Sequence, residues 1–402
     1  MPLDPMVLED LLSHVRRFVD ERLRPLEAEV SEKDEIPSAI LDEMRALGLF
    51  GLSIPEVYGG LGLSMAEECR LILEFGRTSP AFRSAFGTNV GIGSQALIRC
   101  GTEKQKQTWL PRIATGELVT AFALTEPGAG SDAAAVQTRA IRDGQGYRLS
   151  GQKIFITNAD RASLFTVVAR TDPDRPRASG LSVFLVPRES AGLTVGRPEK
   201  KMGQQGARVC PVFLEDVAVP LDNRLGEEGE GFGIAMDVLA RGRIHIAALC
   251  CGTAERLIED SIAYASERRQ FGRPIAEFQL IQAMIADSVA ESLAARALVL
   301  DAAARFDEQA AAPALVSSAK YFASEMVGRV ADRAVQIHGG AGYIADHGIE
   351  RFYRDVRLFR IYEGTSQIQQ LIIARDRLNS ASARRWVDQL GGDANRNVIP
   401  LV

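Results

Sequence analysis

The spacing of apolar residues changes period twice along this chain of 402 residues, and no other feature limits the possible folds as strongly. Residues 6–118 carry apolar side chains every three or four positions, which predicts amphipathic helices. Residues 119–219 hold short runs of β-branched and aromatic residues separated by turn signals, which predicts a small all-β unit, either a barrel or a sandwich. From residue 231 the helical period returns in long segments with short connections, as in an antiparallel bundle.

Two changes of period in a chain too long for one core indicate an α+β multidomain protein. We expect an N-terminal helical domain (1–118), a middle β domain (119–230), a C-terminal antiparallel helix bundle (231–385) and a loosely held tail (386–402). The expected helices include 65–75, 84–100, 232–268, 278–306 and 313–337. The expected strands are 146–150, 153–157, 164–169, 181–186 and 212–214. Local signals predict a capping box at Thr102 and Gln105, a helix end at Leu110-Pro111, and a turn at Ser150-Gly151.

The composition excludes several classes of protein. Hydrophobic residues make up 46% and charged residues 25%, as in ordinary globular proteins, and the net charge of −5 argues against a general nucleic-acid binder. No uncharged run is long enough to span a membrane, so we expect no membrane insertion. Of the four histidines, His245 lies in an apolar helical run and is expected to pack in the core. Five scattered cysteines without metal-ligand spacing predict reduced thiols in a cytoplasmic protein and no metal site: Cys69, Cys100, Cys210, Cys250 and Cys251.

The stretch from Ile361 to Gln369 places a carboxylate next to a glycine just ahead of a helix. Ser366 and Gln369 match a capping box, so the helix is expected to begin near Ser366. Its first-turn N–H groups would face the space beside Gly364, which suits a phosphate, an oxyanion or an electron-rich ring edge. If the neighbours of Glu363 exclude water, desolvation raises the pKa of its carboxyl group and makes it a stronger base, able to take a proton from carbon. The alternative is a solvated glutamate before an ordinary helix start.

A second stretch, from Phe122 to Asp132, carries two glycines flanked by hydroxyl side chains. Gly128 and Gly130 would let the backbone approach a planar or anionic ligand closely. The stretch is not a dinucleotide fingerprint, because it lacks the G-x-G-x-x-G spacing and no strand–turn–helix unit surrounds it. A plain Pro-Gly turn between a helix and a strand would look much the same.

Taken together, five stretches of this sequence resemble the acyl-CoA dehydrogenases, which are flavoproteins with helical, β-barrel and helical domains in that order. The stretches are Thr125–Asp132, Gly151–Lys153 with Ile156–Asn158, Glu267–Gly272 with Phe278–Gln279, Gln336–Gly340, and Tyr362–Gln367. The resemblance covers nearly the whole chain and keeps the family's order and spacing. It implies that the middle domain is a β-barrel and that the cofactor is FAD.

The resemblance also implies which residues contact FAD. Thr125 and Thr157 would bond the flavin ring, and Phe155 would cover one face where many members carry a tryptophan. Arg268 would hold the pyrophosphate, since its forked donors match paired oxygens, while Gln336 would reach the FAD of another subunit. Without the resemblance, Arg268 would be a surface arginine at a helix end. The full set of expected contacts is Phe122, Leu124, Thr125, Gly130, Ser131, Phe155, Ile156, Thr157, Arg268, Gln270, Phe271, Phe278, Gln279, Gln336, Gly339, Gly340, Thr365, Ser366 and Gln367.

The reaction that the resemblance implies is FAD-dependent α,β-dehydrogenation of an acyl-CoA thioester to a trans-2-enoyl-CoA. Glu363 would take the α-proton, and the β-hydrogen would leave as hydride to flavin N5. A ribityl hydroxyl and the Glu363 N–H would hold the carbonyl oxygen. Some members carry the base just before the position of Arg243, but this chain has Gly242 there, which favours Glu363. Ser131, Arg243 and Gly364 fall at positions that touch the acyl-CoA.

Partners and alternatives follow from the same resemblance. Electrons would pass to an electron-transfer flavoprotein, and the chain would form a homo-oligomer, expected to be a tetramer with cofactor sites shared between subunits. The segment 240–247 looks most like short- or branched-chain members, which implies fatty acid or branched-chain amino acid catabolism. Three alternatives remain: an acyl-CoA oxidase that uses oxygen, a flavin monooxygenase-like relative, and a non-catalytic helical scaffold of the same fold. Glu363 counts against the monooxygenase, and the intact set of FAD contacts counts against the scaffold.

Overall fold

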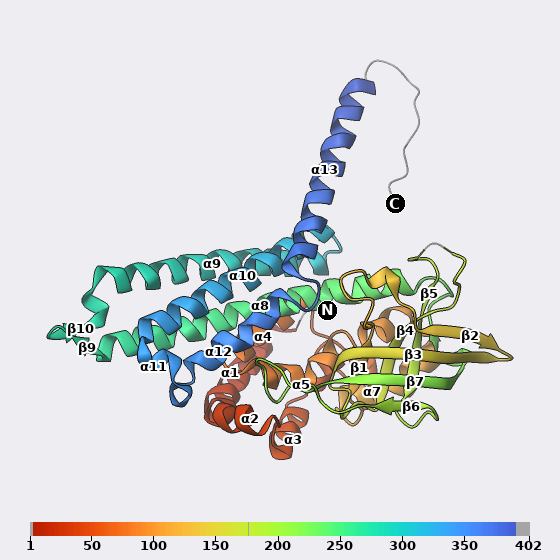
Figure 1. Cartoon of the computed structure of the whole chain (residues 1–402), viewed down its shortest axis with the longest axis horizontal. Helices are drawn as coiled ribbons and strands as arrows, with labels where there is room; N and C mark the ends of the chain where they lie inside the picture. The colour runs from red at the N-terminus through yellow and green to blue at the C-terminus, as the bar shows by residue number, and fades with distance from the viewer. Residues whose placement is uncertain (1–2, 176, 391–402) are drawn as a thin grey trace.

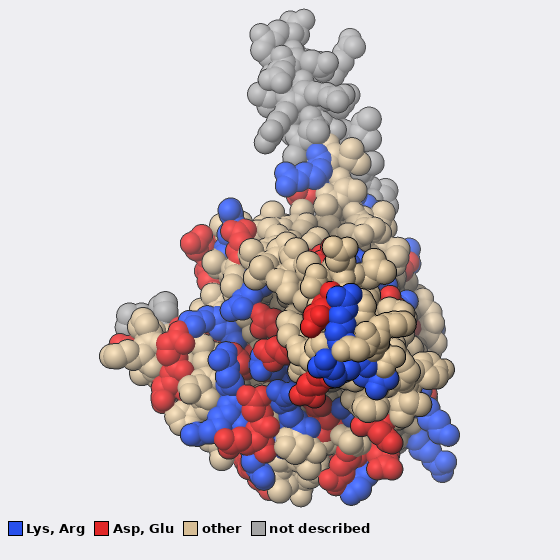
Figure 2. All heavy atoms as spheres, turned by 90° about the vertical axis from the view of Figure 1, so that its left-hand side faces the viewer, with Lys and Arg blue, Asp and Glu red and all other residues tan. Residues whose placement is uncertain are grey.

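The computed structural model describes residues 3–175 and 177–390. Figure 1 shows short N-terminal helices, a sheet on the right, and a set of long helices that extends to the left. Within the described residues, no helix is both long and apolar enough to cross a bilayer. Figure 2 shows acidic and basic side chains interspersed over the left-hand face, so charge of one sign does not gather on that face.

Short helices form the N-terminal part: α1 (Pro5–Phe18), α2 (Glu27–Lys33), α3 (Ser38–Ala46), α4 (Met65–Gly76), α5 (Pro80–Val90), α6 (Gln95–Cys100) and α7 (Glu103–Ala114). The capping box that starts α7 is confirmed, because Thr102 Oγ1 accepts from Gln105 N at 3.2 Å and Gln105 Oε1 accepts from Thr102 N at 2.7 Å. The single helix predicted over 84–100 is wrong, since the backbone leaves the helical region at Gly91 and divides the segment into α5 and α6. The predicted end at Pro111 is also wrong. The helix α7 continues to Ala114, because a proline near a helix end removes only one hydrogen bond.

The strands belong to one sheet: β1 (Thr120–Ala123), β2 (Arg139–Asp143), β3 (Gly146–Thr157), β4 (Leu164–Arg170), β5 (Leu181–Pro187), β6 (Leu193–Val195), β7 (Val209–Pro220) and β8 (Arg224–Leu225). Their order is β6-β7-β3-β2-β4-β5-β8, and β1 pairs with β4. The outermost strands β6 and β8 do not pair with each other in the described part of the chain. A closed barrel is therefore not confirmed, and the observed unit is a sheet with two free ends.

Strand β3 replaces two predicted strands and the turn between them. It runs through Ser150 and Gly151, with irregular register against β7 at Leu149/Gly151 and again at Lys153/Ile156. A Cβ on Gly151 would lie 2.5 Å from Thr138 Oγ1, so the glycine permits close packing instead of a turn. The second irregularity bends the strand where Phe155 has a φ of +57°.

Long helices form the C-terminal part: α8 (Gly231–Glu267), α9 (Gln279–Asp307), α10 (Pro313–His338), α11 (Gly340–Tyr343), α12 (Ile349–Val356) and α13 (Ser366–Leu390). A hairpin of β9 (Arg269–Gln270) and β10 (Arg273–Pro274) joins α8 to α9. In Figure 1, α8, α9 and α10 lie side by side, whereas α13 projects away from them. Residues 386–390, predicted to begin a loose tail, are the last turn of α13. The rest of that tail lies outside the described residues.

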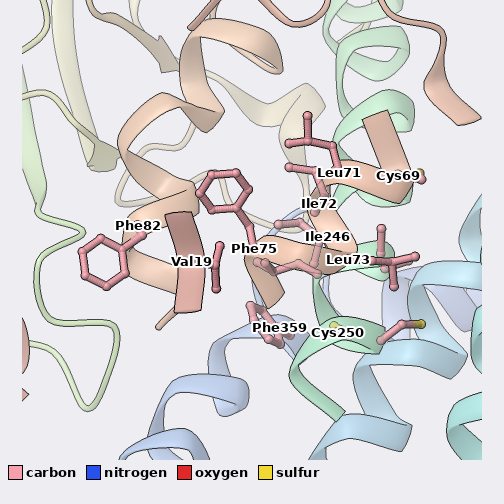
Figure 3. Packing of buried hydrophobic residues seen from close by; sticks show 14 of the residues in the cluster. Val19, Cys69, Leu71, Ile72, Leu73, Phe75, Phe82, Ile246, Cys250 and Phe359 are labelled. Atoms are coloured by element: carbon pink, nitrogen blue, oxygen red, sulfur yellow. The ribbon is translucent and has the colours of Figure 1, made fainter. Parts of the chain in front are cut away.

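The main core joins the two helical parts. Leu71, Ile72 and Phe75 of α4 pack against Ile246 and Cys250 of α8 (Figure 3). The two helices approach closely at Gly76 and Gly252, where a Cβ on Gly252 would lie 2.9 Å from the Gly76 Cα. Because α8 also continues along the sheet, this packing fixes the position of the sheet relative to the bundle.

Candidate active site

A cavity of about 420 Å³ lies where α5, the sheet and the C-terminal helices meet. Asn158, which follows β3, closes the contact between sheet and helix, because its Nδ2 donates to Ser84 O and to Thr88 Oγ1, both at 2.8 Å. The lining residues that matter most are Arg83 and Gly87 of α5, Phe155 and Thr157 of β3, Gly242 of α8, and Arg357 and Glu363.

Glu363 lies between the 3₁₀ turn η9 (Arg357–Arg360) and α13, in the left-handed region at φ +56°. This conformation turns its side chain toward the cavity. Its Oε2 is buried and has no hydrogen-bond partner within the described residues. Burial raises the pKa of the Glu363 carboxyl group, while the cations of Arg83, Arg243 and Lys320 oppose that rise. The side chain is therefore a partly desolvated carboxylate with one oxygen free to accept a proton.

Gly242 forms the surface on which this carboxylate lies. A Cβ at position 242 would be 2.7 Å from both Oε1 and Oε2 of Glu363. A side chain at 242 and the observed position of the Glu363 carboxylate are thus mutually exclusive. A carboxylate at position 363 in this conformation therefore requires glycine at position 242.

Three side chains fix the backbone that carries the carboxylate. Arg243 Nε donates to Glu363 O at 3.1 Å, and Lys320 Nζ donates to Gly364 O at 2.7 Å. Gln369 Nε2 donates to both of these carbonyl oxygens, at 3.1 and 3.0 Å. Burial lowers the pKa of Lys320 to about 8. These contacts hold a turn that the local sequence alone would leave mobile.

The predicted capping box at Ser366 and Gln369 is wrong, although the helix does begin at Ser366. The residue that caps the first turn is Thr365, whose Oγ1 accepts from Ile368 N at 3.3 Å. Ser366 Oγ instead donates to Glu325 Oε1 at 2.6 Å, and the Gln369 side chain turns back to the carbonyls of the preceding loop. The polar side chains of this turn therefore stabilise the loop more than the helix.

The part of the cavity lining that β3 forms suits a flat ring system. Phe155 is 61% exposed although it is aromatic, and the bend in β3 directs it to the cavity that Thr157 also lines. In the loop before β2, a Cβ at Gly128 or Gly130 would meet nothing within 4 Å, so the backbone there is open to a ligand. Exposed aromatic surface, a hydroxyl and open backbone within one region fit the isoalloxazine part of a flavin.

A buried ion pair anchors that loop to the sheet. Lys153 is fully buried, and its Nζ donates to Glu126 Oε1 at 2.7 Å, to Val168 O at 2.7 Å and to Leu124 O at 3.0 Å. Burial lowers the pKa of Lys153 to about 8. Burial also acts to raise the pKa of Glu126, but Lys153 and the hydrogen bonds from Thr138 and Gln137 bring it below its usual value. Both groups remain charged near neutral pH.

The other residues predicted to contact the flavin differ in whether their side chains are exposed. The side chains of Phe122, Leu124 and Ile156 are buried in the core, so only their backbone groups could reach a cofactor. Gly130 and Ser131 are exposed, and Gln367 is exposed on α13.

The remaining predicted FAD residues lie around the C-terminal end of α8, far from Gly242. Arg268 caps its C-terminus, about 39 Å from Gly242 at 1.5 Å per residue. Phe271 is 94% exposed at the tip of the β9–β10 hairpin. One set of predicted contacts lies in or next to this hairpin: Arg268, Gln270, Phe271, Phe278 and Gln279. A second set lies where α10 ends and α11 begins: Gln336, Gly339 and Gly340. Figure 1 shows α11 and the hairpin at the same end of the bundle. One chain therefore does not bring these two sets together with the predicted contacts at the cavity.

Several residues of the site were not predicted as such. Lys320 lies in an ordinary helical run, and its partner Gly364 is 44 positions away, so no local pattern marks it. Arg83 is likewise a single arginine in a helical segment. Lys153 lies within a stretch that resembles the family, but only its full burial, unusual for a lysine, shows that it is an anchor.

Comparison with family models gives three consecutive matches. They are the acyl-CoA dehydrogenase N-terminal domain over residues 8–117, the middle domain over 121–217, and the C-terminal domain over 229–378. Among curated proteins, a probable acyl-CoA dehydrogenase of Bacillus subtilis is 41% identical, over 90% of this chain and 96% of its own length. A subunit of the caffeyl-CoA reductase–Etf complex of Acetobacterium woodii is 42% identical, over 86% of this chain and 91% of its own.

Solved structures agree with these matches. Butyryl-CoA dehydrogenase from Megasphaera elsdenii superposes with a TM-score of 0.90 at 34% identity, covering 94% of this chain and 99% of that one. An acyl-CoA dehydrogenase from Bacillus anthracis, solved in complex with FAD, gives a TM-score of 0.89 at 35% identity, covering 94% of this chain and 68% of that one.

Proposed function

The chain belongs to the acyl-CoA dehydrogenase family, and from this premise we propose that it removes one hydrogen each from the α- and β-carbons of an acyl-CoA thioester, with Glu363 as the α-proton base. The protein is an oxidoreductase, and its cofactor is FAD. One observation carries the assignment of the base. The Glu363 carboxylate faces the cavity with a buried, unpartnered oxygen, and Gly242 leaves it room to do so.

The chemistry requires a strong base and a means of holding negative charge. An α C–H beside a thioester is a very weak acid, and its carbonyl oxygen becomes more negative as the proton leaves. Desolvated Glu363 takes this proton, and the product is a trans-2-enoyl-CoA. The Glu363 N–H has no partner within the described residues, which supports its role as a donor to the carbonyl oxygen. Bound FAD supplies the acceptor for the two electrons that leave with the β-hydrogen.

The substrate contacts follow from the same arrangement. Arg243 holds the Glu363 carbonyl and is itself 7% exposed, so it acts on the acyl-CoA mainly by positioning the base. Gly364, at φ +89°, and the exposed Ser131 would border the thioester and its CoA part. Thr125, Phe155 and Thr157 would hold the flavin ring.

The same site could catalyse the reverse reaction, because a group that removes the α-proton in one direction donates a proton to the α-carbon in the other. A relative with 42% identity is named as part of a caffeyl-CoA reductase. Reduction of a 2-enoyl-CoA, with Glu363 as the proton donor to the α-carbon, is therefore the second candidate. Flavin reduction by saturated esters compared with reoxidation by 2-enoyl-CoA esters distinguishes the two.

Assembly and location complete the proposal. The separation of the two groups of FAD residues along α8 supports a homo-oligomer with shared sites, expected to be a tetramer. A relative named as part of an Etf complex supports an electron-transfer flavoprotein as the partner. The five free cysteines support a reducing compartment such as the cytoplasm. The divisions at residues 118/119 and 230/231 serve as the domain boundaries of this proposal.

The direct test of the function is anaerobic mixing of the purified, FAD-bound protein with acyl-CoA esters. We expect a yellow protein whose flavin absorbance is bleached by substrate. A colourless preparation that FAD cannot reconstitute would support the scaffold alternative instead. Faster turnover with oxygen than with an artificial electron acceptor would identify an oxidase.

A further inference from the structure

Arg83 is a buried cation in the wall of the cavity that contains Glu363. It lies on α5 and is only 8% exposed. Its guanidinium lies over Gly87, one turn further along the helix, because a Cβ at Gly87 would come within 2.9 Å of Arg83 Cζ and Nη1. The missing side chain at Gly87 therefore makes the space in which the guanidinium lies along the cavity wall.

The partners of Arg83 do not neutralise it. Its Nη2 contacts His245 Nδ1, and its Nε is buried without a hydrogen-bond partner. Burial, Arg83 and Arg241 all lower the pKa of His245 well below its usual value, so this imidazole is neutral and provides an acceptor rather than a charge. Within the part of the chain that the structure describes, no carboxylate lies within ion-pair distance of Arg83.

Neither of the two nearby acids forms an ion pair with Arg83. Glu68 Oε2 lies 2.8 Å from Arg241 Nη2, and this pair is almost completely enclosed. Glu363 is close enough to act on the pKa of Arg83, but its carboxylate lies on Gly242 and is not paired with the guanidinium. Arg243 and Lys320, the other buried cations here, donate to the carbonyls of the catalytic turn. The region thus contains more buried positive than negative charge.

A buried guanidinium without a counter-ion is costly, and the cost is recovered when a ligand supplies the anion. Arginine cannot lose its charge in a protein, and its forked donors match a carboxylate in a bidentate pair. Since Glu363 and Arg83 line one cavity, an acyl chain whose α-carbon meets Glu363 can extend toward Arg83.

We propose that Arg83 binds a carboxylate at the far end of the acyl chain, so that the substrate is the CoA monothioester of a dicarboxylic acid. This inference rests on the proposed function and makes its substrate class specific. The missing side chain of Gly87 leaves room for the guanidinium of Arg83, and the contact with His245 Nδ1 holds that guanidinium in place.

The test compares esters of equal chain length with and without the terminal carboxylate: glutaryl-CoA with pentanoyl-CoA, adipyl-CoA with hexanoyl-CoA, and pimeloyl-CoA with heptanoyl-CoA. For at least one pair, the wild-type protein should reduce its flavin with a kcat/KM at least tenfold higher for the carboxylated ester. Arg83→Met, which keeps a long side chain without charge, should abolish that preference, and Arg83→Lys should retain part of it. Arg99→Met removes an exposed arginine that does not line this cavity and should leave the preference intact.

A binding measurement makes the result independent of turnover. In the Glu363→Gln background, calorimetry should show that adding Arg83→Met weakens binding of the carboxylated ester at least tenfold and leaves that of its unsubstituted partner unchanged. Wild-type flavin reduction by the unsubstituted esters alone, or an Arg83→Met variant with the wild-type preference, would overturn the inference while the proposed function stood. If no ester of either kind bleached the flavin, the proposed function itself would fail, and this inference with it.

Discussion

At the scale of single residues, the reactivity of the site depends on how one left-handed glutamate is held. Placing a residue other than glycine in this region costs about 1–2 kcal/mol. Hydrogen bonds from charged groups contribute about 1.5–3 kcal/mol each, so the two from Arg243 and Lys320 to this turn outweigh the cost. These hydrogen bonds therefore stabilise the strained backbone conformation of Glu363, and its carboxylate stays directed at the cavity.

The substitution Gly242→Ala tests whether the Glu363 carboxylate must lie against Gly242. The added methyl group would lie 2.7 Å from both oxygens of Glu363 and would displace them. We expect flavin reduction by substrate to slow by about 10²-fold, because a displacement of about 1 Å costs that much, while FAD stays bound. Stopped-flow absorbance under anaerobic conditions measures the rate. Gly233→Ala is the matched control, since a Cβ there on the same helix meets nothing within 4 Å; equal rates in the two variants would contradict the account.

The pH dependence follows from the raised pKa of Glu363. The base acts only when deprotonated, so the rate of flavin reduction should rise with pH through this pKa and level off above it. The pKa of a free glutamate is about 4.3, and the acidic limb of the profile should lie above that value. Because the Arg83 cation lowers the pKa of Glu363, Arg83→Met should move the limb to higher pH. A limb at the value of a free glutamate, or a shift to lower pH in the variant, would contradict this.

At the scale of the element, the loop that we propose faces the flavin depends on the pair between Glu126 and Lys153. Glu126 accepts from Gln137 N at 2.6 Å and from Thr138 N at 2.9 Å, in addition to Lys153, and so joins the loop, β2 and β3. Without the acid, the buried ammonium would lose its counter-ion. The loop would then lose its attachment to the sheet.

Glu126→Ala should lower the free energy of unfolding by about 3–5 kcal/mol, because removing one partner leaves a buried charge unpaired. Urea denaturation followed by circular dichroism measures this loss. Asp132→Ala, in the same loop, removes an exposed partner of Arg177 and should cost about 1 kcal/mol or less. If both variants were equally stable, the buried pair would not be the anchor that its geometry indicates.

Elements were predictable from sequence to the extent that local pattern determines them. The long helices α8, α9 and α10 begin and end within a residue or two of the prediction, because apolar period and flanking breakers are local signals. Ser150-Gly151 looked like a turn because only the contact with Thr138 shows why glycine is needed within β3. The candidate site follows the same rule: the local stretch together with the family resemblance marks Glu363 as a candidate base, whereas Arg83 and Lys320 depend on partners distant in sequence.

At the scale of the whole molecule, the separation of the predicted FAD residues is the observation that supports the proposed assembly. Phe155 and Glu363 line the cavity beside Gly242 in the first half of α8, and Phe271 lies exposed beyond the C-terminal end of that helix. Large apolar side chains are also exposed along α9, where Leu280 is 81% and Leu293 is 63% exposed. Such surfaces in a helical bundle suit contact with a second copy of the chain.

Replacing Gln336 and Gly339 with bulky charged residues should therefore weaken both FAD retention and the oligomer, because binding at a shared site stabilises the assembly. Gly339, at φ +57°, also tolerates a side chain poorly. Light scattering combined with flavin absorbance measures both properties in one experiment. A wild-type monomer with full FAD occupancy would refute the shared site.

The central claim is that Glu363 is the base, and Glu363→Gln tests it most directly. The amide keeps the shape and hydrogen-bonding capacity of the side chain but cannot accept the α-proton. In anaerobic rapid mixing with the best acyl-CoA substrate, the variant should retain FAD and bind the ester, while its rate constant for flavin reduction falls by about 10²–10⁴-fold. A rate constant near that of the wild-type protein would show that the base lies elsewhere.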